Sequence, residues 1–373
     1  MLSTILRERA HGKAESRVCR VLFNVFADED NYNAQSLNAR DIALRLDPTQ
    51  FCSTMFFEKT PDPRLLRPGI CLVKLPEGRK TWRILREMMG SHDFIVYIDL
   101  SPASYLYLHL PRFFRRSTRT VLCIEGSRGN LSGVSATVRR YAEYLVQHAD
   151  LRITISEFLA WELLDLYGLK SDFTVPVGVD THLFLPPPER NNAPLAILFV
   201  GHLIERKGAH LVLEAARHFP QARFRMIGHA RDDFGHNLKL TLRGAGLANV
   251  SIEDPVSQAQ MVRIMQESDI LLLPSRVEGI PKVTLEAAAA GLPCVVFDDY
   301  QTPSVVDGVT GFQVKKFEEM LVRLQLLIQD HELRRRMCAA AVAHAKSFDW
   351  DRVAAQWGDI LGNLEQRVGV AEK

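Results

Sequence analysis

Pro274-Ser-Arg-Val-Glu-Gly-Ile-Pro-Lys-Val-Thr-Leu-Glu-Ala-Ala-Ala-Ala-Gly-Leu-Pro293 follows a short apolar run and predicts a buried strand, a turn and a short helix. Gly279 and Pro281 break the apolar run, and Pro281 is expected at the first helical position, where its missing N–H costs least. Gly291 and Pro293 are expected to end the helix. This order of elements is typical of a parallel α/β domain.

Two carboxylates of this stretch, Glu278 and Glu286, are separated by seven residues. One is expected in the turn at the mouth of a parallel sheet, and the other about two turns into the helix. Both could then face one crevice. Because a helix N-terminus favours an anion and carboxylates accept hydrogen bonds from hydroxyl groups, the stretch predicts a ligand that carries phosphate and several hydroxyls.

Similar apolar runs, separated by segments long enough for crossover helices, recur along the chain. In the first half, the expected strands are 18–26, 51–57, 70–75, 94–99, 120–124 and 151–155, and the expected helices include 34–46, 131–148 and 157–168. In the second half, strands are expected at 196–200, 223–227, 250–253, 270–273 and 294–297, and helices near 207–218, 236–245, 257–267 and 281–290. This pattern predicts two doubly wound, Rossmann-like α/β domains.

The proline-rich stretch 176–188 is expected to connect these domains. We therefore expect an N-terminal domain, a linker, a C-terminal domain and a final segment at 1–180, 181–194, 195–346 and 347–373. The tail is expected to be helical over 316–329, 332–346 and 350–364. The broad apolar face of its last helix predicts packing against another part of the chain, such as the first domain.

The composition argues against several classes of protein. The net charge of +2, with both signs mixed along the chain, argues against nucleic acid as a partner. The six cysteines lie far apart and are expected to be free thiols in a reducing compartment. No apolar run approaches the roughly 20 residues of a membrane span, and the N-terminus lacks a signal-peptide core. We therefore expect a cytoplasmic protein.

The turn after the first strand of the second domain, Gly201 to Gly208, is a second candidate site. Gly201 would let a phosphate approach the backbone, and Arg206 and Lys207 lie where the strand ends and the helix begins. A solvated basic loop is the alternative. Two strand-end sites that face one crevice favour the phosphate site.

Together these motifs resemble the signature of retaining glycosyltransferases of family 4 (glycosyl transferases group 1), which have the GT-B fold. The resemblance covers about residues 145–362 and rests on several motifs in the right order and spacing. They are Gly201 with Arg206-Lys207-Gly208, Pro274-Ser275, Glu278-Gly279 with Glu286, and 287–293, 307–311, 149–158, 176–180 and 348–350. The resemblance implies two domains that face each other across a cleft and a C-terminal helix that crosses back to the first domain.

The resemblance also implies roles for individual residues. A UDP-, GDP- or ADP-sugar would bind mainly to the second domain, and the first domain would hold an acceptor hydroxyl of a glycan, lipid carrier or small molecule. By analogy Glu286 binds the ribose, Glu278 contacts the donor sugar, and Lys207 neutralises the diphosphate. The other implied donor-binding residues are Gly201, His202, Arg206, Ser275, Gly279, Ile280 and Lys282. The resemblance implies retention of the anomeric configuration, with the acceptor proton passing to the leaving phosphate, and it requires no metal or other cofactor.

The sequence departs from the family pattern at three positions. His202 replaces the usual arginine, and its charge depends on pH. Pro281 replaces a glycine and removes a backbone donor, for which Lys282 could compensate. Glu125 stands where the first domain often carries a histidine. Glu125 could contact the sugar or the acceptor, or it could cap the turn at Ser127 or Arg128.

Other polar segments have two readings. Asn33, Gln35 and Ser36 could line the acceptor side at the start of a helix. Three acidic clusters, at 28–30, 232–233 and 298–299, are expected to be solvated loops rather than metal sites. The stretch 111–119 interleaves phenylalanine with arginine, which would allow peripheral contact with an anionic membrane at the inner face, although most such basic runs are ordinary exposed loops.

The best-supported function is therefore transfer of a hexosyl-type sugar from a nucleotide donor to a hydroxyl group. A nucleotide-sugar epimerase or hydrolase on the same fold would need an acid/base pair, for which Glu125 and His202 are the candidates. A protein that binds a nucleotide sugar without catalysis would explain the altered positions 202 and 281. A scaffold that binds no ligand fits least well, because both Glu278 and Glu286 are present.

Overall fold

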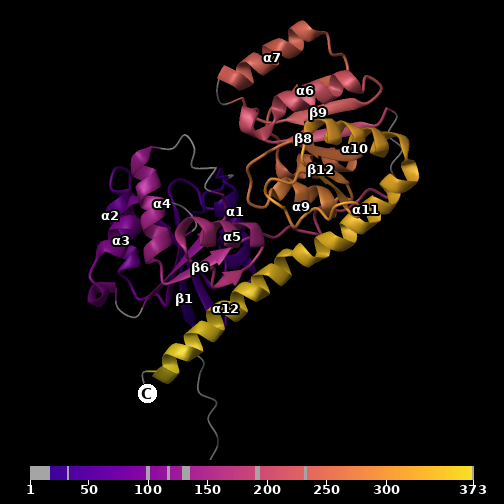
Figure 1. The fold of residues 1–373 in the computed structure, drawn as a ribbon. Helices are drawn as coiled ribbons and strands as arrows, with labels where there is room; N and C mark the ends of the chain where they lie inside the picture. The colour runs from indigo at the N-terminus through magenta and orange to yellow at the C-terminus, as the bar shows by residue number, and fades with distance from the viewer. Residues whose placement is uncertain are drawn as a thin grey trace, which may run out of the picture.

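The computed structural model describes residues 17–31, 33–97, 101–115, 118–127, 135–189, 194–230 and 233–371. They form two parallel sheets, one in each half of the chain, with helices packed against them (Figure 1). The first sheet ends at Thr174 and the second begins at Ala196, so the proline-rich stretch lies between the sheets.

The first sheet has seven strands in the order β3-β2-β1-β4-β5-β6-β7. The strands are β1 (Cys19–Phe26), β2 (Phe51–Phe57), β3 (Ile70–Lys74), β4 (Phe94–Tyr97), β5 (Arg119–Ile124), β6 (Leu151–Thr154) and β7 (Phe173–Thr174). The helices are α1 (Ala34–Arg45), α2 (Lys80–Met88), α3 (Pro102–His109), α4 (Ala136–His148) and α5 (Glu157–Tyr167), with short 3₁₀ helices η1 (Pro63–Leu65) and η2 (Arg112–Arg115).

The second sheet has six strands in the order β10-β9-β8-β11-β12-β13. The strands are β8 (Ala196–Val200), β9 (Arg223–Ile227), β10 (Val250–Glu253), β11 (Ile270–Leu273), β12 (Cys294–Phe297) and β13 (Gly311–Val314). The helical elements are η4 (Glu205–Lys207), α6 (Ala209–His218), α7 (Asp233–Ala245), α8 (Gln258–Gln266), α9 (Lys282–Ala289), α10 (Phe317–Gln329), α11 (His331–Ala345) and η5 (Lys346–Phe348). The strand order reverses between β8 and β11, where doubly wound sheets open a crevice for ligands.

The expected fold class is confirmed. The central strands β4, β11 and β12 are buried along their whole length, which explains their unbroken apolar sequences. The strands expected at 51–57, 196–200, 223–227, 250–253, 270–273 and 294–297 have the observed bounds. Apart from the short 3₁₀ helices, the described elements that are not among those expected from the sequence are α2, α3, β7 and β13. Parts of the expected elements 94–99 and 131–148 lie outside the described residues.

One local expectation is wrong: Pro281 is not the first helical residue. Its backbone is extended (φ −65°, ψ 115°), and it is the N-cap of α9, which begins at Lys282. The Pro281 carbonyl accepts from the Thr284 hydroxyl at 2.7 Å, so its oxygen is used at the helix start. At the other end, Gly291 is left-handed (φ 73°) and ends the helix as expected.

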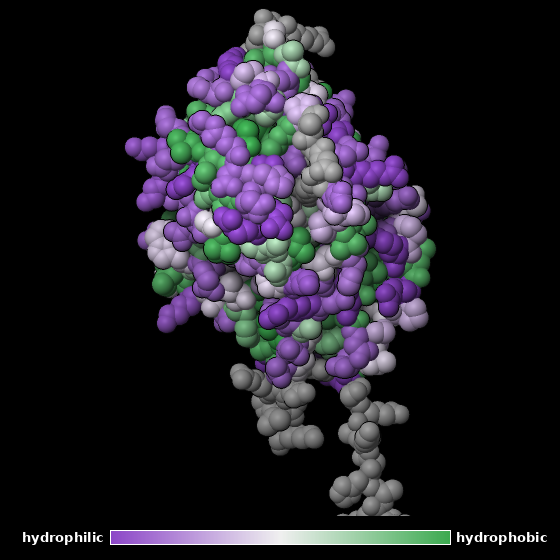
Figure 2. All heavy atoms as spheres, turned by 90° about the vertical axis from the view of Figure 1, so that its right-hand side faces the viewer, coloured by the Kyte–Doolittle hydropathy of each residue, from purple (hydrophilic) through white to green (hydrophobic). Residues whose placement is uncertain are grey.

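The last helix, α12 (Trp350–Ala371), packs along α1 and also contacts β1. In Figure 1 it runs from the second domain back beneath the first, which confirms the expected crossing. Within the described part of the chain, none of the helices has the length and apolar character to span a bilayer. Figure 2 shows one face of the molecule, on which hydrophilic side chains surround scattered hydrophobic ones.

The two segments that cross between the domains lie side by side. The Val179 N–H donates to the Phe348 carbonyl at 2.8 Å, and the Trp350 N–H donates to the Val179 carbonyl at 3.1 Å. Gly178 packs against the Trp350 ring so closely that a Cβ atom there would lie 2.4 Å from a ring carbon. These contacts fix the path of both crossings.

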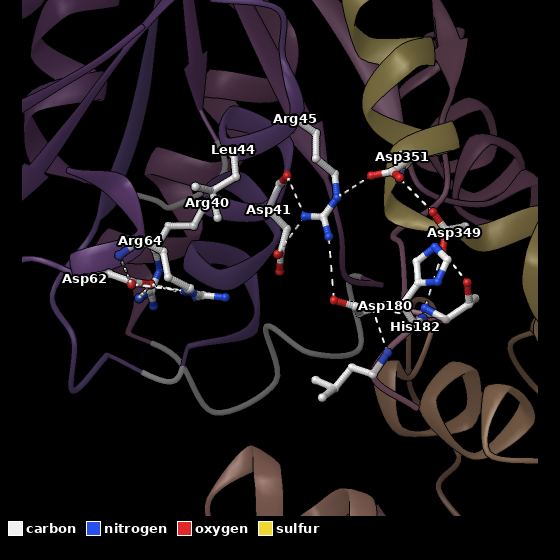
Figure 3. Close-up of polar contacts among 12 residues, drawn as sticks. Arg40, Asp41, Leu44, Arg45, Asp62, Arg64, Asp180, His182, Asp349 and Asp351 are labelled. Atoms are coloured by element: carbon white, nitrogen blue, oxygen red, sulfur yellow. Dashed lines mark hydrogen bonds and ion pairs between the residues drawn. The ribbon is translucent and has the colours of Figure 1, made fainter. Parts of the chain in front are cut away.

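Arg45 joins the crossings to the first domain. Its guanidinium pairs with Asp41 at 3.1 Å, Asp351 at 2.8 Å and Asp180 at 3.7 Å (Figure 3). These carboxylates belong to α1, to the start of α12 and to the connector. One cation therefore links the three segments on which the relative position of the domains depends.

Candidate functional site

A cavity of about 690 Å³ lies between the two domains. Its walls come from α1, α4, α5 and the end of β5 in the first domain, and from the loops after β8, β9, β10 and β11, with residues of α8 and α9, in the second. The carboxyl ends of strands from both sheets thus open into one space, which is where doubly wound domains place their ligands.

Lys207 and Glu278 form an ion pair on the cavity wall. Glu278 is only 8 % exposed, and its Oε1 also accepts a hydrogen bond of 2.6 Å from the Ser275 hydroxyl. A buried carboxylate needs such partners, because it has lost its hydration. The pair therefore places a fixed cation and a fixed carboxylate side by side in the cleft.

Gly208 explains how the loop after β8, which carries Lys207, meets the loop after β11, which carries Glu278. Its backbone is left-handed (φ +69°), and a Cβ atom there would lie 2.1 Å from the Pro274 carbonyl oxygen. Glycine meets both requirements, since it tolerates this conformation and leaves room for the neighbouring backbone. The close approach brings η4 and Lys207 against the loop after β11.

Two residues expected to bind the donor support the loop after β11. Arg206 is not on the cavity wall, and its Nη1 donates to the Val277 carbonyl at 2.8 Å. Ser275 is fully buried beside Glu278. Their polar groups therefore hold backbone and carboxylate in place in this structure, and their expected contact with the donor stays a prediction.

The other expected donor-side residues, Glu286 excepted, line the cavity: Gly201, His202, Gly279, Ile280 and Lys282. Pro281 and Val283 lie beside them on the wall. Gly228, in the loop after β9, was not expected from the sequence. A Cβ atom on Gly228 would lie 1.8 Å from the Gly201 carbonyl oxygen, so this glycine lets the loops after β8 and β9 touch.

Gly279 also marks the contact between the domains. A Cβ atom there would lie 2.2 Å from the carbonyl oxygen of Glu125, which follows β5 in the first domain. The Glu125 carboxylate accepts a hydrogen bond of 3.0 Å from Asn38 Nδ2 and a weaker one of 3.8 Å from the Cys123 thiol. Glu125 is therefore held on the cavity wall, close to the turn that carries Glu278.

The alternative role for Glu125 is to cap the following turn at Ser127 or Arg128. The Ser127 hydroxyl donates to Glu162 on α5 at 2.7 Å. Arg128, the other residue considered, lies outside the described residues.

Of the three residues expected on the acceptor side, one lines the cavity and two do not. Gln35 lines the cavity. Asn33 is the exposed N-cap of α1, and its side-chain oxygen accepts from the Gln35 N–H at 2.9 Å. Ser36 is buried and hydrogen-bonded to Asn31 at 3.2 Å. Neither Asn33 nor Ser36 is on the wall, because both are used to start the helix; Asn38, one turn after Gln35, is on the wall instead.

Glu286 is not among the residues that line the cavity. Its side chain is partly exposed, and it forms no hydrogen bond or ion pair with another residue in the described part of the chain. Desolvation by burial raises the pKa of Glu286 to about 7; Lys282 opposes the shift and Asp41 adds to it. Glu286 is thus a carboxylate with unused acceptor capacity one helical turn beyond Lys282.

We expect Glu286→Gln to stabilise the protein at pH 8 but hardly at pH 5. Because the native pKa exceeds the ordinary value of 4.5, the native state retains the proton that the unfolded chain loses, and stability falls as the pH rises through about 7. The glutamine side chain does not ionise, so the variant avoids this pH-dependent loss of stability, which is worth at most about 3 kcal/mol. Urea unfolding at both pH values measures it, with exposed Glu318→Gln as control. A gain that does not change with pH would contradict the assignment.

Two of the acidic clusters, at 28–30 and 298–299, have protein partners, whereas Asp232 of the third lies outside the described residues. Asp28 accepts the N–H groups of Glu58 and Lys59 at 3.0 and 2.7 Å. Asp30 pairs with Lys59 at 2.9 Å, and Asp299 pairs with Arg276 at 3.0 Å. Over the described ranges, no three His, Cys, Asp or Glu side chains are grouped as a metal site would require.

In the stretch 111–119, Phe113 and Phe114 are 76 % and 50 % exposed, with ring centroids 3.9 Å apart. Arg112 pairs with Asp150 at 2.8 Å, and Arg119 donates to the Leu364 carbonyl at 3.3 Å. Residues 116–117 lie outside the described residues. In the described part of this stretch, Phe113 and Phe114 therefore lie exposed beside Arg112, whose side chain is 73 % exposed.

Comparison with known proteins adds to this picture. Residues 184–343 match the family model "Glycosyl transferases group 1". The chain is similar to the D-inositol 3-phosphate glycosyltransferase of Corynebacterium diphtheriae, 29 % identical over 60 % of this chain and 59 % of the relative. It is also similar to that of Corynebacterium aurimucosum, 30 % identical over 60 % of each. The chain thus matches these curated relatives over about 60 % of their length.

Solved structures match over nearly the whole chain. Anabaena Alr3699/HepE in complex with UDP and glucose has a TM-score of 0.76 and 18 % identity, over 92 % of this chain and 99 % of that one. Sucrose-phosphate synthase from Thermosynechococcus elongatus has a TM-score of 0.76 and 16 % identity, over 94 % and 100 %. At this identity the likeness concerns the fold. The chain therefore has the GT-B fold, and its residues 184–343 match the glycosyl transferases group 1 model.

Proposed function

We propose that the chain is a retaining glycosyltransferase of family 4 that transfers a sugar from a nucleotide donor to an acceptor hydroxyl. The observation that carries this proposal is the Lys207–Glu278 pair on the wall of the interdomain cavity, where Glu278 lies in the turn whose Gly279 touches Glu125. A cation, a carboxylate and a tight backbone turn together suit a diphosphate linked to a sugar.

The geometry suggests how the reaction would proceed. As the bond between the anomeric carbon and the phosphate oxygen breaks, negative charge grows on the diphosphate, and Lys207 Nζ would offset it in a cleft that excludes much of the water. The acceptor oxygen would bond to the anomeric carbon on the face that the phosphate leaves. The acceptor proton would pass to the leaving phosphate oxygen. Glu278 and Glu125 would orient the sugar and the acceptor by accepting hydrogen bonds from their hydroxyls.

The comparisons support a uridine nucleotide as donor. Alr3699/HepE has been solved with UDP, with UDP-glucose and with UDP and glucose. The cavity wall on this side includes Pro255 and Val256, beside Gly228 and His229, which offer an apolar surface for a base. Glu286, with its unused acceptor capacity, is our candidate partner for the ribose hydroxyls.

A thermal-shift screen against UDP-, GDP- and ADP-sugars tests the proposal. We expect a UDP-sugar to raise the melting temperature, because a ligand that binds only the native state stabilises it. Product analysis with candidate acceptors should then show transfer that exceeds donor hydrolysis. Hydrolysis at the same rate with and without acceptors would favour a hydrolase, and no stabilisation by any nucleotide would refute the proposal.

We also propose that the first domain touches anionic membrane through the stretch 111–119. Besides Phe113 and Phe114, Trp82 on α2 is 68 % exposed and Leu106 on α3 is 40 % exposed, and α2 packs on α3. Exposed aromatic side chains next to arginines are typical of peripheral membrane surfaces.

We expect wild-type protein to float with vesicles that contain phosphatidylserine. Phe113→Ser combined with Phe114→Ser should lose most of this binding, because the exposed apolar area that would enter the interface is removed. Val322→Ser, at a position 62 % exposed on α10 of the second domain, is the matched control. Equal flotation of the three proteins would contradict the proposal.

A further inference from the structure

The interdomain cavity has two chemically different ends. Near Lys207 and Glu278 its wall is polar, and Glu125, Gln35 and Asn38 continue this polar lining into the first domain. Beyond Glu125 the wall becomes aliphatic. The residues of this second end come from β5, α4 and α5: Leu122, Ala142, Val146, Leu159, Leu163 and Leu166.

The aliphatic end lies between two helices that do not close on each other. Strands β4 to β7 follow one another in the sheet, so right-handed crossovers place α3, α4 and α5 on the same face (Figure 1). On this face α2 packs on α3 and α3 packs on α4. Between the described residues of α4 and α5 there is no comparable packing. Because these residues of α4 and α5 do not pack closely, a channel remains between them. Leu166 lines this channel and is 38 % exposed, so the channel reaches the protein surface.

An aliphatic channel of this kind favours some classes of acceptor over others. A hydroxyl-rich glycan segment placed against these side chains would lose hydrogen bonds to water and gain none, which costs free energy. An alkyl or isoprenoid group would instead bury apolar surface on both sides. Glu162 lies where the polar and apolar ends meet. Its carboxylate accepts a hydrogen bond from the Ser127 hydroxyl, so it has a partner at the entrance of the channel.

We propose that the acceptor is an amphiphile: its hydroxyl-bearing head lies beside Glu125, and its apolar chain lies between α4 and α5. This inference rests on the proposed function, because it assigns the acceptor of that reaction. It restricts the acceptor from any hydroxyl compound to one with a linear apolar group attached close to the reacting hydroxyl.

Binding of n-alkyl glucosides tests the channel without requiring turnover. Methyl, butyl, hexyl and octyl glucoside are titrated calorimetrically below their micelle concentrations. Each buried CH₂ should tighten binding by about fourfold. Ala142→Trp, which fills the channel from α4, should abolish this dependence on chain length. Gln147→Trp, on an exposed position of the same helix, should retain it.

A second variant, Leu166→Glu, places a charge in the channel at a position that is already partly exposed, so it should fold even if Ala142→Trp does not. Wild-type affinity that does not change from methyl to octyl would overturn the inference. So would an undiminished chain-length dependence in the folded channel variants. UDP is titrated into the same proteins: failure of UDP to bind wild type would count against the proposed function alone, whereas normal UDP binding without chain-length dependence would count against the channel alone.

Discussion

Lys207→Ala is expected to lower kcat by about 10²- to 10³-fold, with a much smaller change in KM for the donor. Lys207 is on the cavity wall, where its ammonium group would offset the charge of the diphosphate as this group leaves. Negative charge on the diphosphate is greater in the transition state than in the bound donor, so loss of the cation acts mainly on turnover. Steady-state kinetics with the donor identified by thermal shift measures both constants.

The ion pair complicates this experiment, because removal of Lys207 leaves Glu278 buried and without its cation. Lys207→Ala should therefore also lower stability, and Glu278→Gln in the same chain should restore much of that stability. The double variant should not recover kcat. Lys207→Arg, which keeps the charge, should retain more activity than Lys207→Ala. If the double variant regained both stability and turnover, Lys207 would act only by holding Glu278.

The fold could be predicted well from the sequence because the apolar runs that determine it are local features of the chain. Central parallel strands are covered on both faces, so they read as unbroken apolar runs, as 270–273 and 294–297 do. The elements not expected lack such a signal. Helix α2 carries Lys80, Trp82 and Arg83, and only Ile84, Leu85 and Met88 of its residues are buried. Strand β7 has two residues and owes its conformation to pairing with β6.

The candidate site was predicted less completely, for reasons that depend on tertiary contacts. Lys207, Glu278 and Gly279 follow strand ends that any doubly wound sheet brings together. In contrast, the sequence cannot show that Arg206 donates to a carbonyl 71 residues away. Gly228 is a single glycine in a loop, and its importance appears only when its contact with Gly201 is seen.

Arg40→Ala is expected to destabilise the protein by about 3–5 kcal/mol, the largest effect on stability that we predict. The Arg40 side chain on α1 is 1 % exposed, and desolvation lowers the pKa of its guanidinium. It donates to the Asp28 carbonyl at 3.1 Å, to the Asn31 carbonyl, and to Asp62 at 3.3 Å (Figure 3 shows the Asp62 side). Alanine would remove the Arg40 donor from all three acceptors, although Asp62 keeps Arg64 and the Asp28 carbonyl keeps the Asn31 N–H, and it would also leave a cavity in the buried site.

Arg64 provides a matched control, because it pairs with the same carboxylate from the outside. Its guanidinium lies 2.7 Å from Asp62, but its side chain is 50 % exposed, so Arg64→Ala should cost no more than about 1 kcal/mol. Urea unfolding of the two variants compares a buried and an exposed arginine on one partner. Equal losses would mean that Arg40 contributes through Asp62 alone. A larger loss for Arg40 is expected because it also holds the loop before α1, and hence the position of Gln35 on the cavity wall.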